Sequence, residues 1–75
     1  MIPNNGDLVK IPQKVVLWKD DYVHYRLTEE VELGLVADKL QDSQYRVLVG
    51  EEFWLVSQED MCLIGANDAK IKRSI

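Results

Sequence analysis

Two β-rich runs, residues 45–49 and 52–56, constrain the fold most because only Gly50 and Glu51 separate them. Glycine in the first central position of a two-residue loop favours a type II′ turn, which closes a tight antiparallel hairpin. The turn also fixes the register, so the side chains of the two runs divide between two faces. We predict a core face that carries Tyr45, Val47, Trp54 and Val56. The outer face then carries Arg46, Leu48, Phe53 and Leu55.

The rest of the chain also has the patterns of short strands. We expect strands over 8–11 and 32–40, an extra hairpin or folded excursion over 13–31, a 3₁₀ turn over 57–60 and a last strand over 61–64. Gly34 should mark a bend in its strand or the close approach of another backbone. No segment sustains apolar residues at helical spacing between caps, and only residues 66–75 have the composition for a short helix.

Length and composition limit the class of protein. A chain of 75 residues has room for one small domain, and 47% apolar with 29% charged residues is an ordinary globular balance. No apolar run reaches the roughly 18 residues that a membrane span needs. We therefore expect a soluble intracellular protein without membrane contacts, and its single cysteine excludes an internal disulfide.

Charge divides the chain into two parts. Residues 1–65 hold six bases and twelve acids, a net charge of −6, whereas residues 66–75 hold three bases and one acid, a net charge of +2. We predict a β-barrel domain over 1–65 and a basic C-terminal tail over 66–75. An acidic body disfavours a nucleic-acid-binding barrel, because such proteins gain affinity from phosphate contacts.

The order of the short motifs resembles one family. The motifs are Gly6-Asp7-Leu8-Val9-Lys10-Ile11, Gly34-Leu35-Val36, Tyr45-Arg46-Val47-Leu48-Val49, Trp54-Leu55-Val56-Ser57 and Asp60-Met61. Over roughly residues 6–65 this pattern resembles small SH3-like proteins of tailed bacteriophages, notably phages of marine cyanobacteria. The resemblance implies an all-β, SH3-like barrel of five to seven short antiparallel strands with a long first loop. Its motifs are strand and turn signatures, so they are specific for the fold and not for a function.

The resemblance also implies a class of function without catalysis. Small phage proteins of this kind are virion components, such as decoration, neck or tail proteins, and others act on host proteins. We therefore expect a non-enzymatic protein–protein interaction module, located in the virion or in the host cytoplasm. Its partner is a larger phage structural protein or, as the alternative, a host protein that it regulates or inhibits; a homo-oligomer stays open.

The sequence offers little for catalysis or cofactor binding. Cys62 and His24 are the only thiol and imidazole, and Cys62 between Met61 and Leu63 should be a buried structural residue. The carboxylates at positions 29, 30 and 32 lack the spacing of a calcium loop and should be solvated. We predict no catalytic residue, no metal site and no cofactor.

The aromatic residues point to a contact surface. Six aromatic side chains are too many for the interior of a small barrel, so some must lie outside. The predicted partner-binding residues are Trp18, Tyr22, Tyr25, Leu48, Phe53, Leu55, Lys70, Lys72 and Arg73. Two alternatives stay open: the excursion or the tail covers the outer patch of the hairpin, or the aromatic residues of the excursion pack into the core.

Overall fold

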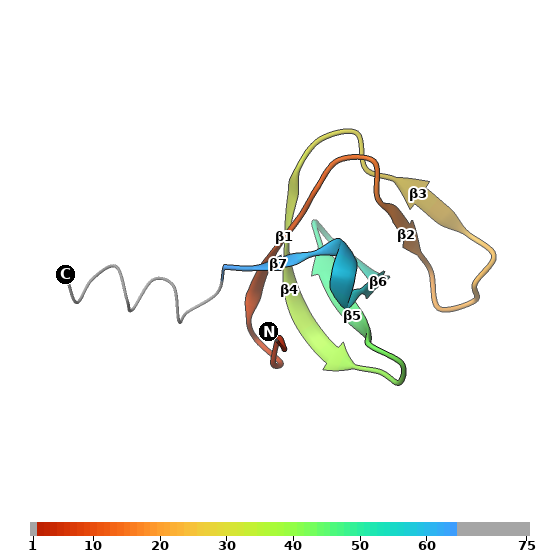
Figure 1. Ribbon diagram of the computed structural model, residues 1–75. Helices are drawn as coiled ribbons and strands as arrows, with labels where there is room; N and C mark the ends of the chain where they lie inside the picture. Colours follow the sequence, from red (N-terminus) through yellow and green to blue (C-terminus); the bar gives the residue numbers. More distant parts are fainter. Residues whose placement is uncertain (1, 65–75) are drawn as a thin grey trace.

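The described part of the chain is all-β, as predicted. A computed structural model describes residues 2–64 (Figure 1). Its elements are β1 (Leu8–Ile11), β2 (Val16–Trp18), β3 (Tyr25–Leu27), β4 (Glu32–Lys39), β5 (Gln44–Val49), β6 (Glu52–Ser57), the 3₁₀ turn η1 (Gln58–Asp60) and β7 (Cys62–Leu63). The predicted tail, with Lys70, Lys72, Arg73 and the short helix considered for it, lies outside the described residues.

The seven strands form one antiparallel sheet. Their order is β3-β2-β6-β5-β4-β1-β7, so β3 and β7 are its edges. The excursion between β1 and β4 is the β2–β3 hairpin, which projects to the right of the other strands in Figure 1. The β1 strand pairs with both β4 and β7, which ties the beginning of the described chain to its end. Among residues 2–64, no helix is long and apolar enough to cross a membrane.

The β5–β6 hairpin has the register that the sequence predicts. Val47 lies opposite Trp54, and Leu48 lies opposite Phe53. Gly50 has a φ of 65°, the positive value that the first central position of a II′ turn requires. The predicted core face is confirmed, because Tyr45, Val47, Trp54 and Val56 are all buried.

One face of the sheet supplies the hydrophobic core. It collects side chains from both ends of the chain: Val9, Ile11, Leu17, Val36, Tyr45, Val47, Val49, Trp54, Val56 and Met61. The β2–β3 hairpin contributes only Leu17 to this cluster. The inner side of that hairpin is therefore held by other kinds of contact.

Gly34 of β4 lies close against β5. A Cβ atom at this position would lie 2.5 Å from Cγ1 of Val47 and 3.1 Å from the carbonyl oxygen of Leu48. No side chain fits that space, which confirms the predicted close approach. A register shift between Val36 and Asp38 adds a further irregularity to the β4–β5 pair.

The predicted burial of Cys62 is wrong. Its neighbours Met61 and Leu63 face the core, so the alternation of the strand turns Cys62 to the outside, opposite Lys10 of β1. The thiol is exposed. An apolar sequence context therefore did not predict burial, because the strand at this point has only one covered face.

Candidate protein-contact surface

The β2–β3 hairpin turns an apolar face outward. Val16 lies opposite Leu27, and Trp18 lies opposite Tyr25. Antiparallel partners share one side of a sheet, so these four residues form one surface, which we call the hairpin face. Trp18 is 36% exposed and Tyr25 is 64% exposed, and their ring centroids lie 5.1 Å apart. The aromatic residues predicted in this excursion are therefore at the surface and not in the core.

The inner side of the same hairpin is held by cations. The Nζ of Lys19 lies 4.2 Å from the ring centroid of Trp54, and the guanidinium carbon of Arg26 lies 5.1 Å from it. Both distances are within the range of cation–π attraction. The β2–β3 hairpin thus attaches to the core through the ring of Trp54 as well as through the buried side chain of Leu17.

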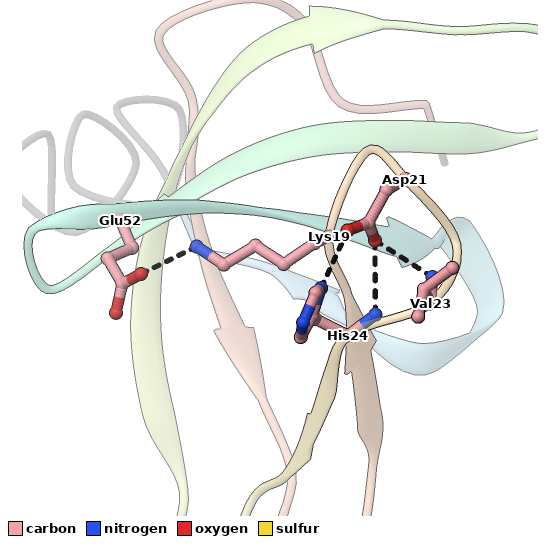
Figure 2. Close-up of polar contacts among 5 residues, drawn as sticks. All are labelled: Lys19, Asp21, Val23, His24 and Glu52. Carbon is pink, nitrogen blue, oxygen red and sulfur yellow. Dashed lines mark hydrogen bonds and ion pairs between the residues drawn. The ribbon is translucent and has the colours of Figure 1, made fainter.

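Each of these cations also binds a carboxylate. Arg26 donates two hydrogen bonds to Glu32, of 2.7 and 3.1 Å. They raise the pKa of Arg26 and lower the pKa of Glu32. Lys19 reaches along β6 and donates to Glu52 at 2.6 Å, which lowers the pKa of that carboxyl (Figure 2). Each cation is therefore held by two contacts, the ring of Trp54 and a carboxylate.

The base of the hairpin is closed by Thr28, a fully buried side chain. Its hydroxyl accepts a hydrogen bond from the Val15 N–H at 2.9 Å and donates one to the Pro12 carbonyl at 2.7 Å. Its backbone N–H donates to the Val15 carbonyl at 2.9 Å, and its carbonyl accepts from the Lys14 N–H at 2.7 Å. One residue thus joins the two ends of the excursion.

The tip of the hairpin has its own hydrogen bonds. The carboxylate of Asp21 accepts the backbone N–H groups of Val23 and His24, and it contacts Nδ1 of His24 at 2.6 Å (Figure 2). These bonds, the one from Val23 first, lower the pKa of Asp21 to about 2. His24 is therefore held by Asp21 in the loop between β2 and β3.

The tip also crosses the outer side of β5. Asp20 accepts a hydrogen bond from Arg46 at 3.2 Å, and the hydroxyl of Tyr22 donates to the Gln44 side chain at 3.0 Å. Arg46 lies opposite Leu55 in the β5–β6 pair. These contacts bring the hairpin over Leu55.

Leu55 is 3% exposed, so its predicted place on an open outer patch is wrong. It lies between Trp18 of β2 and Arg46 of β5, its partners on the two sides. The alternative that the excursion covers the outer patch therefore holds for this one residue. Its neighbour on the same side, Phe53, stays 48% exposed.

A second apolar group crosses the same outer side of the sheet. Leu8 pairs with Leu35, Leu35 with Leu48, and Leu48 with Phe53, so the row spans four strands. We call these four residues the outer row. Leu35 and Phe53 are exposed, and Leu8 and Leu48 are half-buried. Beside Phe53 the surface is hollowed, and the lining residues are Lys19, Asp20, Asp21, His24, Glu52 and Phe53.

The six predicted site residues within the described part of the chain thus fall into three groups. Trp18, Tyr22, Tyr25 and Phe53 are exposed, Leu48 is half-buried and Leu55 is buried. The predicted contact residues did not include Leu8, Val16, Leu27 and Leu35. Successive side chains of a strand point to opposite faces, and both Leu8 and Leu35 stand next to a core residue in sequence. This alternation could have placed them on the outer face. Val16 and Leu27 gave no such signal.

The described residues contain no cluster of three or more His, Cys, Asp or Glu side chains suited to a metal ion. What they do contain is an apolar side of the sheet with two parts, the hairpin face and the outer row, which Leu55 separates. Comparison with protein-family models, curated proteins and solved structures finds no match to this chain.

Proposed function

We propose that this chain is a non-enzymatic protein–protein interaction module built on a small SH3-like barrel. The strand succession β7-β1-β4-β5-β6 supports this barrel, with the β2–β3 excursion inserted after the first strand and a 3₁₀ turn before the last. The core on one face of a small sheet supports it as well.

One observation carries the interaction function. The hairpin face is apolar and exposed although Thr28, Arg26 and Lys19 fix the hairpin itself. A held hairpin loses little conformational entropy on binding, and burial of its apolar face would stabilise a complex. Contiguous exposed apolar groups often mark contact surfaces.

The biological setting we propose comes from the resemblance to phage proteins. In this setting the module is a virion structural or accessory protein that docks on a larger phage protein. The alternative is a regulator that binds a host protein during infection. Mass spectrometry of purified virions separates the two, because a structural component is present in every particle and a regulator is absent.

A pull-down with the tagged chain tests the contact surface. We expect Trp18→Ser and Phe53→Ser each to weaken capture of the partner from purified virions or an infected-cell lysate about tenfold or more, as central apolar contacts do. Ile2→Ser is the matched control, because Ile2 is also exposed but belongs to neither apolar group. Equal capture by all four proteins would contradict the proposal.

A further inference from the structure

The β3 strand has an unpaired backbone edge. The Lys19 N–H donates to the His24 carbonyl at 2.8 Å, and the Thr28 N–H donates to the Val15 carbonyl at 2.9 Å. Backbone groups alternate along an antiparallel strand, so residues 24, 26 and 28 turn theirs toward β2. Tyr25 and Leu27 therefore turn their N–H and carbonyl groups away from the sheet.

These groups have no protein partner within residues 2–64. The β3 strand is the last in the sheet order, and no other described segment donates to or accepts from its free edge. Tyr25 and Leu27 are 64% and 47% exposed, so the edge is accessible. Such an edge is a template for an added strand.

The charge beside this edge indicates what kind of strand fits. Glu29 and Glu30 follow β3 after Thr28, are exposed, and form no ion pair with any described residue. They line a hollow together with Leu27, Arg26 and Glu32. Glu32 is already bound by Arg26, so two free carboxylates remain at the end of β3.

We propose that β3 accepts an extended, basic segment of a partner protein as an added strand. This rests on the proposed interaction function and names the chemistry of the partner. A second copy of this chain fits less well, because antiparallel β3–β3 pairing would place Glu29 and Glu30 near the acidic tip with Asp20 and Asp21. Like charges that lie near each other across two paired strands destabilise the pair.

The neighbouring side chains define the sequence pattern of the segment. Residues opposite Tyr25 and Leu27 lie on the outer side and should be apolar, because they extend the hairpin face. The residue opposite Arg26 should be uncharged, since Glu32 already binds that guanidinium. Two basic residues should come next to Glu29 and Glu30.

A synthetic peptide tests this pattern. Acetyl-Lys-Lys-Thr-Val-Thr-Val-amide places its lysines at Glu30 and Glu29 and its valines at Leu27 and Tyr25 when it runs antiparallel to β3. Amide hydrogen exchange followed by NMR measures the result. At a peptide concentration about ten times Kd, exchange at Tyr25 and Leu27 should slow about tenfold, because only free protein exchanges there.

Two control peptides separate strand addition from attraction between charges. The peptide with both valines replaced by proline keeps its charge but loses the two N–H donors that face β3, so it should not protect the two amides. The peptide with both lysines replaced by glutamate should bind more weakly than the parent. Protection by the proline peptide equal to that by the parent would overturn strand addition.

Charge variants of the protein test the role of the two carboxylates. Glu29→Gln with Glu30→Gln should raise the Kd of the basic peptide about three- to tenfold, the range expected for two exposed ion pairs. Glu51→Gln with Glu59→Gln removes the same charge from exposed positions elsewhere and should leave the Kd unchanged. Equal effects of the two double variants would overturn the proposed site.

The natural complex distinguishes the two proposals. If a captured partner depends on Trp18 but leaves the Tyr25 and Leu27 amides unprotected, the contact function holds and strand addition is wrong. Protection at Leu63 instead would move the strand-accepting edge to β7 and also overturn the assignment to β3. Slowed exchange at Tyr25 and Leu27, lost on Glu29→Gln with Glu30→Gln, supports it.

Discussion

The two hairpins of this sheet are stabilised in opposite ways. The β5–β6 hairpin buries apolar side chains, among them Val47 and Trp54, on its inner side. The β2–β3 hairpin directs Arg26 and Lys19 inward, where they cover the ring of Trp54, and leaves most of its apolar residues outside. The difference shows that apolar content does not by itself locate the core, because a strand can be attached by cations and hydrogen bonds.

The largest expected loss of stability comes from a substitution that breaks the connection between the two hairpins. Trp54→Ala removes a buried ring and the surface that Lys19 and Arg26 cover, so the free energy of unfolding should fall by about 3–5 kcal/mol. Urea or thermal unfolding measures this. Trp18→Ala is the matched control, because Trp18 is exposed and should cost much less. Equal losses would mean that the two tryptophans have similar roles.

An intermediate effect is expected at the base of the β2–β3 hairpin. Thr28→Ala leaves the Val15 N–H and the Pro12 carbonyl without their side-chain partner, which should cost about 1–3 kcal/mol. Thr28→Ser keeps the hydroxyl and should retain most of the stability. If the serine variant unfolds as easily as the alanine variant, the threonine methyl and not the hydroxyl fixes the hairpin.

The smallest effect concerns the ion pair of Arg26 and Glu32. The pKa of Glu32 is lowered in the folded protein, so its contribution is fully present above the ordinary pKa of a glutamate and is lost as the pH falls through the lowered value. Because the pair is partly exposed, the contribution should be at most about 1 kcal/mol.

Unfolding of the wild type and of Glu32→Gln, at pH 7 and at acid pH, measures the contribution of this ion pair to stability. The two proteins should differ at pH 7 and converge in acid. Asp21→Asn should behave similarly, with its effect extending to lower pH because its pKa is about 2. A constant difference between the wild type and Glu32→Gln at all pH values would contradict the role of the charge.

Local turn chemistry explains what the sequence could predict. Gly50 indicated the register of the β5–β6 hairpin, and Gly34 indicated the close approach to β5. Residues 13–31 were expected to form an extra hairpin or a folded excursion, but the faces could not be assigned, because Val16, Leu17 and Trp18 are consecutive apolar residues without a period of two.

The remaining errors arose from long-range contacts. Leu55 is flanked by Trp18 of β2 and by Arg46, which Asp20 of the tip binds; Trp18 and Asp20 lie more than thirty residues earlier in the chain. Cys62 is exposed because the short β7 strand pairs with β1 and has only one covered face. Neither contact has a local sequence signal, because Met61, Cys62 and Leu63 are also consecutive apolar residues without a period of two.

The pairing of β1 with β7 has a consequence for the order of events during synthesis. Val9 lies opposite Leu63, and the Ile64 N–H donates to the Leu8 carbonyl at 2.9 Å. Until residues 61–64 leave the ribosome, β1 has only one of its two neighbours, and the core lacks Met61. We infer that this domain completes its folding only after nearly all of residues 2–64 have been translated, so the earlier strands must stay unaggregated for that time.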